Sequence, residues 1–220
     1  MTVKTSIGWC DITVNPIKGS CLNNCRLPDG RAYCYYSGER GIAKRFKQDP
    51  TLRLDLSVFS KLPKQPKRIF LCSTNDYWGN WIPSEWRQAI TEEANKYPHT
   101  YQILTQSPEN IDDQFPTKSQ VGITITGIQK LPRPSCSIDW LLCKDLPFRF
   151  VSFEPLLARI GQSVLEKLVA LDWVIIGRLT GYGHKYDPKP EWVKEIVEVC
   201  HEALVPSFLK SNLRGVWPSK

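Results

Sequence analysis

The segment FRFVSFEPLLARIGQSVLEKLVALDWVIIG, residues 148–177, decides the fold class. Its two ends, Phe148–Phe153 and Asp172–Gly177, are short runs of β-branched and aromatic residues that are apolar at successive positions. That pattern is typical of strands buried on both faces of a parallel sheet. Between them, the amphipathic stretch Gly161–Ala170 predicts a helix. The segment therefore predicts one right-handed strand–helix–strand crossover.

Similar runs recur along the chain. The other predicted strands are Ile7–Val14, Arg68–Ser73, Tyr101–Thr105, Gln120–Thr126 and Pro206–Lys210. Further helices are predicted at Ser37–Lys47, Ser84–Tyr97 and Pro190–Ala203, with proline-rich surface connections at Lys61–Lys67 and Leu131–Ser135. Six or seven strand–helix units favour an α/β fold, a single partial (β/α) barrel of TIM type over residues 1–220. A doubly wound open sheet is the competing fold.

Composition limits the class of protein. The chain has 220 residues, of which 41% are hydrophobic and 23% charged, and this excludes disordered, collagen-like and coiled-coil chains. No window approaches the ~18 apolar residues of a membrane helix, and Met1–Ser6 has no apolar leader. We therefore expect a soluble, cytoplasmic protein without a membrane partner. The net charge of +7 permits an anionic partner such as nucleic acid.

Polar residues stand at the ends of the predicted strands, where a parallel barrel gathers its functional groups. They are Asn75, Asp76, Thr105, Thr124, Glu154, Arg178 and Lys210. Glu154 follows a buried apolar strand directly, and an ionised carboxylate there is costly unless it has a partner. Arg178, at the end of the neighbouring strand, is the partner that we expect.

Three of the eight cysteines, Cys21, Cys25 and Cys34, follow the first predicted strand. A structural zinc site fills four ligand positions, whereas three thiolates leave one position open. Three ligands and an open position suit a four-iron cluster. A zinc site with Cys10 as fourth ligand and a set of unliganded thiols remain alternatives. The other cysteines are expected to be buried apolar thiols, and they are Cys72, Cys136, Cys143 and Cys200.

The spacing Cys21-x-x-x-Cys25, followed by Tyr33-Cys34, resembles the CxxxCx(aromatic)C motif of radical S-adenosylmethionine enzymes. That superfamily carries the motif after the first strand of a partial barrel. The chain departs from it by an insert, Arg26–Ala32, between the second and third cysteines. The insert contains the turn signal Pro28-Asp29-Gly30, so we expect it to loop out and leave the ligands in place.

A narrower resemblance covers nearly the whole chain. The matching phrases are Trp9-Cys10-Asp11 with Asn15-Pro16, Ser73–Trp78, Ile103–Asn110, Val121–Thr124, Phe150–Leu157, Asp172–Gly177 and Val205–Lys210. In order, they resemble a phage- and prophage-associated three-cysteine family of uncharacterised radical-SAM-like proteins. Two departures are Cys10, where threonine is expected, and Arg178-Leu179-Thr180, which replaces a phrase richer in glycine and acidic residues.

The resemblance implies a 4Fe–4S cluster on Cys21, Cys25 and Cys34 that cleaves S-adenosyl-L-methionine to a 5′-deoxyadenosyl radical, with an external electron donor. It places contacts to the cofactor's methionine amino group at Asn75 and Asp76. Thr105 and Thr124 join them as cofactor-binding candidates, and Glu154, Arg178 and Lys210 are the catalytic candidates, fixing ribose, carboxylate or substrate. We expect a macromolecular substrate, a nucleic acid or a protein. The competing hypothesis is a zinc-stapled nucleic-acid-binding protein without catalytic activity.

Overall fold

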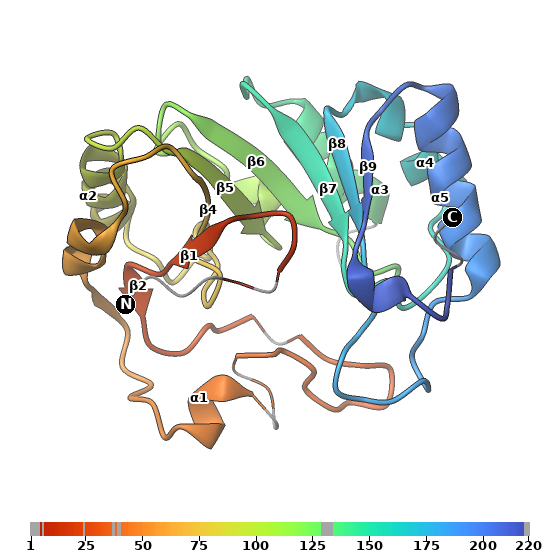
Figure 1. The fold of residues 1–220 in the computed structure, drawn as a ribbon, viewed down its shortest axis with the longest axis horizontal. Helices are drawn as coiled ribbons and strands as arrows, with labels where there is room; N and C mark the ends of the chain where they lie inside the picture. Colours follow the sequence, from red (N-terminus) through yellow and green to blue (C-terminus); the bar gives the residue numbers. More distant parts are fainter. Residues whose placement is uncertain are drawn as a thin grey trace. The chain divides into compact units, whose positions relative to one another are not determined.

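The computed structural model describes residues 5, 7–23, 25–36, 38, 41–128 and 134–217. These residues form two compact units, the first containing Cys10–Ser119 and the second Ser6–Trp9 with Gln120–Lys220. Both units are α/β, with three parallel strands in the first and four in the second, in chain order (Figure 1). This confirms the predicted α/β class with seven parallel strands, and the strand order is consistent with a partial barrel.

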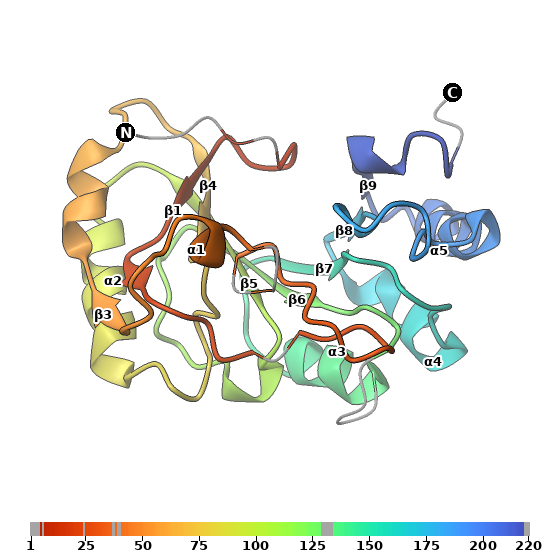
Figure 2. The same cartoon turned by 90° about the horizontal axis from the view of Figure 1, so that it is seen from below.

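The first unit is built on β1 (Ile12–Val14), β4 (Arg68–Leu71) and β5 (Thr100–Thr105), paired in that order. Their inward residues form its core, and Leu71 and Ile103 are fully buried. Helix α2 (Ser84–Ala94) connects β4 to β5 and lies beside these strands in both views (Figures 1 and 2). The carboxyl ends of the three strands therefore lie at one edge of this sheet.

Three short elements of the first unit had no signal in the sequence. They are β2 (Ile17–Lys18), β3 (Arg53–Leu54) and η1 (Leu56–Lys61), and β2 pairs antiparallel with β3. Two-residue strands are too short for any periodicity to mark them. η2 (Pro108–Asn110) completes this part of the chain.

The helix predicted over Ser37–Lys47 is wrong in length, because only α1 (Ile42–Arg45) forms. This short helix buries none of its residues, so no packing supports a longer one. Gly41 precedes it, and a side chain there would lie 2.2 Å from the Tyr36 carbonyl oxygen. Ser37, Glu39 and Arg40 lie outside the described residues.

The described residues of the second unit form four parallel strands and three helices. The strands are β6 (Ser119–Thr124), β7 (Arg149–Phe153), β8 (Trp173–Ile176) and β9 (Ser207–Leu209), paired in that order. The helices are α3 (Pro134–Leu142), α4 (Gln162–Leu165) and α5 (Pro190–Glu202), with the short turns η3 (Leu168–Ala170) and η4 (Ser211–Leu213). α3 contacts β7 and α5 contacts β9.

Two segments of this unit differ from their predicted structure. The connection predicted at Leu131–Ser135 is wrong at its end, because Pro134 begins α3, and proline fits the first turn of a helix. Residues 131–133 lie outside the described residues. The helix predicted over Gly161–Ala170 is divided into α4 and η3.

The first predicted strand, Ile7–Val14, is also too long. β1 begins only at Ile12, and Gly8 has a left-handed backbone (φ 87°), which departs from strand geometry. Trp9 packs in the second unit, where its ring lies 6.2 Å from the rings of Phe150 and Trp173. An aromatic cluster therefore replaces the expected start of the strand.

Gly122 of β6 lies in register with Phe150 of β7, and the ring covers it. A Cβ atom at Gly122 would lie 2.5 Å from the Phe150 ring. We expect Gly122→Ala to lower the free energy of unfolding by about 1–3 kcal/mol through overpacking, measured by denaturant unfolding. Gly161→Ala, where no atom lies within 4 Å of the added Cβ, is the control and should cost less than ~1 kcal/mol. A fully stable Gly122→Ala variant would show that this packing is wrong.

Candidate functional site

The insert between the second and third cysteines folds back on itself. Arg26 and Ala32, at its two ends, form an antiparallel bridge. Directly after it, the Tyr33 N–H donates to the carbonyl of Cys25 at 3.0 Å. The insert therefore loops out, as predicted, and returns the chain beside Cys25 just before Cys34.

The three thiols of this segment form no disulfide, and all three are partly buried. Burial raises the pKa of the Cys21 thiol to about 12 and that of Cys25 to about 11, and the neighbouring cysteines contribute to both shifts. The two thiols are therefore protonated at neutral pH, and metal binding there would release protons. Within the part of the chain that the structure describes, no three His, Cys, Asp or Glu side chains are arranged to hold a single metal ion.

Asp76, which follows β4, is 4% exposed. It connects residues 21–34, which we call the cysteine segment, to β5. Its Oδ1 accepts hydrogen bonds from the Thr105 hydroxyl at 2.6 Å and the Trp78 N–H at 3.2 Å. Its Oδ2 accepts from the Asn23 side-chain amide at 2.7 Å and the Gln106 N–H at 2.9 Å. Asn23 lies between the first two cysteines, so one oxygen atom joins the cysteine segment to the end of β5.

The environment of Asp76 acts on its pKa in two directions. Burial raises the pKa of this carboxyl above its ordinary value, while the hydrogen bonds from Thr105, Gln106 and Asn23 act to lower it. All four of its partners are donors, and the Thr105 hydroxyl, which donates to Asp76, accepts in turn from the Ser107 N–H at 2.9 Å. An arrangement of donors alone suits the ionised carboxylate.

Asn75 carries a buried donor without a partner. Its side-chain oxygen accepts from the Trp81 indole N–H at 3.1 Å and from the Asp76 N–H at 3.0 Å. Its Nδ2, in a residue only 6% exposed, has no hydrogen-bond partner among the described residues. Buried amide groups are nearly always paired, so this nitrogen is a group that a bound ligand could satisfy.

Gln106 extends the same network to a sulfur atom. Its side-chain amide nitrogen donates to Cys25 Sγ at 3.2 Å, and the residue itself is exposed. Neither Gln106 nor Asn23 was among the predicted site residues. Gln106 follows Thr105 at the end of a strand, which is a weak signal, whereas no spacing rule marks Asn23.

In the second unit, the Lys210 ammonium group donates to the carboxylate of Glu154, at the ends of β9 and β7. Both side chains are mostly buried, 15% and 24% exposed respectively. Gly177, which follows β8, leaves room for this pair, since a Cβ atom there would lie 3.0 Å from Lys210 Cδ and 3.1 Å from Glu154 Cδ.

Arg178 is not the partner of Glu154, and this expectation is wrong. Its guanidinium donates instead to Asp187 Oδ1 at 2.7 Å and to the carbonyl of Asn212 at 2.6 Å. The Asp187 side chain is 13% exposed, and Arg178 together with His184 outweighs the effect of burial and holds the pKa of Asp187 below its usual value. Asp187, a mostly buried carboxylate nine residues after Arg178, is therefore the partner of the Arg178 guanidinium in place of Glu154.

The predicted site residues fall into two groups, one in each unit. The first unit holds Cys21, Cys25, Cys34, Asn75, Asp76 and Thr105. The second unit holds Thr124, Glu154, Arg178 and Lys210. Each group lies at or beyond the carboxyl ends of its own unit's parallel strands, as expected for functional residues of an α/β fold.

The other cysteines follow the prediction in part. Cys72 and Cys200 are buried free thiols, as expected, whereas Cys143 is exposed and that expectation is wrong. The Cys143 thiol lies at the end of α3 and donates to the Trp140 carbonyl at 3.2 Å. The Cys136 side chain lies outside the described residues, and Cys10 is buried.

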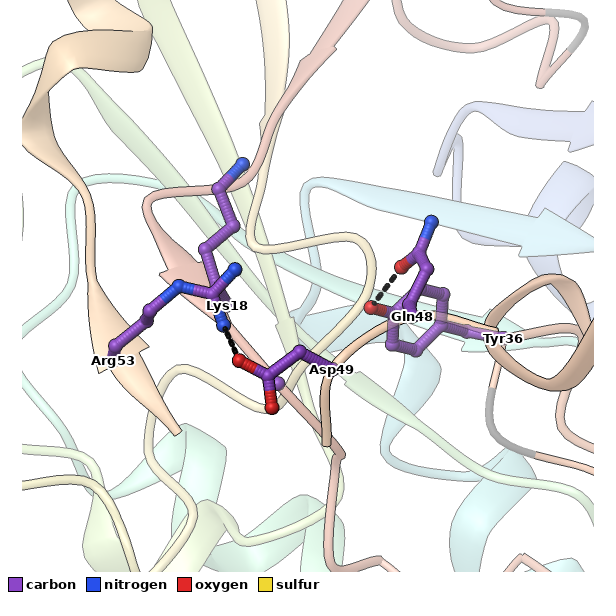
Figure 3. Close-up of a pocket in the computed structure, with 6 residues that line it drawn as sticks. Lys18, Tyr36, Gln48, Asp49 and Arg53 are labelled. Atoms are coloured by element: carbon purple, nitrogen blue, oxygen red, sulfur yellow. Dashed lines mark hydrogen bonds and ion pairs between the residues drawn. The ribbon is translucent and has the colours of Figure 1, made fainter. Parts of the chain in front are cut away.

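A polar cavity of about 290 Å³ lies beside the cysteine segment (Figure 3). Its lining residues come from before and after that segment in the sequence. Tyr36 donates from its hydroxyl to the side-chain oxygen of Gln48 at 2.7 Å, and Arg53 donates to Asp49 at 2.9 Å. Lys18 lies 3.8 Å from Asp55. Each cation of the cavity thus has a carboxylate beside it, and none of the predicted site residues lines it.

Comparison with protein families gives one match. A family model described as "Protein of unknown function (DUF5131)" matches residues 4–219. The chain belongs to this family. The DUF5131 match spans the residues of both groups, the cysteine segment and the Glu154–Lys210 pair. No curated protein and no solved structure matches the chain. Among the described residues of this DUF5131 protein, no helix is both long and apolar enough to cross a membrane.

Proposed function

We propose that this DUF5131 protein is a cytoplasmic radical S-adenosylmethionine enzyme with a 4Fe–4S cluster on Cys21, Cys25 and Cys34. The observation that carries the proposal is the folded-back insert, in which the Tyr33 N–H donates to the Cys25 carbonyl at 3.0 Å. This contact brings the Tyr33-Cys34 pair back to Cys25 despite the longer spacing in the sequence. It therefore supports the cysteine arrangement that the resemblance to the superfamily implies.

The residues around the thiols fit such a cluster. Three partly buried thiols lie in a segment that the Asn23–Asp76 hydrogen bond holds at the carboxyl edge of the first unit's sheet. Three thiolates leave one coordination position open for a cofactor. A hydrogen bond to a ligand sulfur, as Gln106 donates to Cys25, is also a common feature of protein-bound clusters.

When bound, the cluster would supply one electron, from an external donor, to cleave S-adenosyl-L-methionine and give a 5′-deoxyadenosyl radical that abstracts hydrogen from the substrate. The chain's own residues bind and orient the cofactor and the substrate, and they exclude water from the site. The free group of Asn75 is a donor, so it suits the carboxylate of the cofactor's methionine moiety better than its ammonium group. Thr105 and Thr124 remain candidates for cofactor contacts in their own units.

Glu154, Arg178 and Lys210 are the proposed catalytic residues of the second unit. The Glu154 carboxylate forms an ion pair with Lys210, and its oxygen atoms can still accept hydrogen bonds from ribose or substrate hydroxyls. Arg178 is held by Asp187 and Asn212 and presents a fixed cation. We propose a macromolecular substrate: the net charge of +7 is compatible with a nucleic acid, and a protein substrate is the alternative.

Metal content after anaerobic purification and reconstitution with iron and sulfide tests the cluster. We expect a brown protein with broad visible absorbance and about four irons per chain. A colourless protein with one stoichiometric zinc, whose filled d shell gives no colour, would contradict the proposal. That result would favour the zinc-stapled nucleic-acid-binding protein instead.

A further inference from the structure

We propose that Gln106 tunes the sulfur of Cys25, and that Asp76 is the buried anchor that positions Gln106 and the cysteine segment together. This inference deepens the proposed function and rests on it for the metal readouts. One oxygen atom, Asp76 Oδ2, accepts both the Asn23 side-chain amide at 2.7 Å and the Gln106 N–H at 2.9 Å. From that fixed backbone position, the Gln106 side chain reaches Cys25 Sγ at 3.2 Å.

Asp76 is a positioning residue because its acceptor sites are already filled. An ionised carboxylate has about four lone-pair sites, and four protein donors occupy them, at distances of 2.6, 2.7, 2.9 and 3.2 Å. No acceptor site remains for the ammonium group of a cofactor. The resemblance places a cofactor contact at Asp76, whereas the network gives this residue a role between the cysteine segment and β5.

The Gln106 side chain affects the reduction potential and metal affinity of the site rather than the stability of the fold. The residue is exposed, and substitutions at exposed positions change stability by only about 0.5 kcal/mol or less. A donor to a ligand sulfur stabilises negative charge there, and a reduced cluster carries one more negative charge than an oxidised one. The Gln106 contact therefore favours the reduced state and raises the reduction potential. It also supports metal binding, because hydrogen-bonding partners of metal ligands contribute to affinity.

The first experiment compares Gln106→Leu with the wild-type protein after reconstitution with iron and sulfide. We expect the reduction potential of Gln106→Leu to be more negative and its iron affinity, measured by chelator competition, to fall about 10- to 100-fold. Gln88→Leu is the matched control, since Gln88 is an exposed glutamine on α2 whose amide donates to Glu92 at 2.9 Å, away from the cysteines. A potential in Gln106→Leu equal to that of the wild type would overturn the tuning role.

The second experiment tests the anchor without any metal. Hydrogen exchange of the peptide covering residues 19–27 should become roughly 10- to 100-fold faster in Asp76→Asn, because an amide cannot accept all four hydrogen bonds. Asp112→Asn is the matched control: Asp112 also accepts four hydrogen bonds, two of them from Arg87, one from Trp78 Nε1 at 3.0 Å and one from the Gln114 N–H. It should leave this peptide unchanged.

The two experiments separate the anchor from the cluster. If the wild-type protein binds no cluster, the proposed function and the tuning of its potential fail, while the exchange experiment still supports or overturns the anchor. If the cluster forms and residues 19–27 exchange equally fast in Asp76→Asn and the wild type, the anchor is overturned and the cluster assignment stands. Should Asp76→Asn not fold, Thr105→Val replaces it with the same expected direction, because it removes the 2.6 Å donor to Asp76, together with the acceptor of the Ser107 N–H.

Discussion

Replacing Cys34 by alanine should leave the reconstituted protein without a cluster, with iron content and visible absorbance close to background. The same result is expected for Cys21→Ala and Cys25→Ala, because a cluster held by three thiolates has no spare protein ligand. Iron analysis and visible absorbance after anaerobic reconstitution measure this loss.

Cys72→Ala and Cys200→Ala are the controls for the cysteine variants. Both thiols are buried and free, so their loss should cost about 1–2 kcal/mol of stability and leave the iron in place. Iron that stays bound in Cys34→Ala would remove the third ligand from the assignment. If Cys10→Ala instead releases zinc from the protein as purified, the four-thiolate zinc site is correct.

Glu154→Gln should weaken the binding of S-adenosylmethionine by about 1.5–3 kcal/mol, roughly 10- to 150-fold, if a charge-assisted hydrogen bond from the cofactor is lost. The change keeps the shape of the side chain and removes its charge, which also leaves the mostly buried Lys210 without its partner. Equilibrium binding of the cofactor and the melting temperature, measured on the same samples, separate the two effects.

Glu195→Gln is the matched control for Glu154→Gln. Glu195 lies in the same unit and pairs with Arg159, whose side chain is 69% exposed, so its loss should change stability by less than about 1 kcal/mol and leave cofactor binding intact. Unchanged cofactor affinity with a lowered melting temperature in Glu154→Gln would show that Glu154 serves only as the ion-pair partner of Lys210.

β4, β5, β6, β7 and β8 could be predicted because each is a largely apolar run with buried residues at successive positions. β7 and β8, for example, lie within one residue of the limits that the segment 148–177 indicates. Elements that depend on tertiary contacts could not be predicted in the same way. β2 and β3 have two residues each, and α1, which buries none of its residues, has only four.

The site residues could be predicted by position but not by partner. Strand ends and cysteine spacing indicated Asp76 and Glu154, because parallel strands place their carboxyl ends together. The sequence could not show that Asp76 would meet Asn23, which is 53 residues away, or that Glu154 would pair with Lys210 rather than with Arg178. Such pairings depend on loop paths and on competing carboxylates such as Asp187, which local patterns do not encode.

We propose that this DUF5131 protein cleaves S-adenosylmethionine reductively at the three-cysteine segment. The most direct measurement is the yield of 5′-deoxyadenosine after the reconstituted protein is incubated anaerobically with S-adenosylmethionine and dithionite. We predict that 5′-deoxyadenosine forms only with reductant and only in the wild-type protein, and that it is absent in Cys25→Ala. A wild-type protein that holds its full complement of iron and yields no more 5′-deoxyadenosine than Cys25→Ala would contradict the claim.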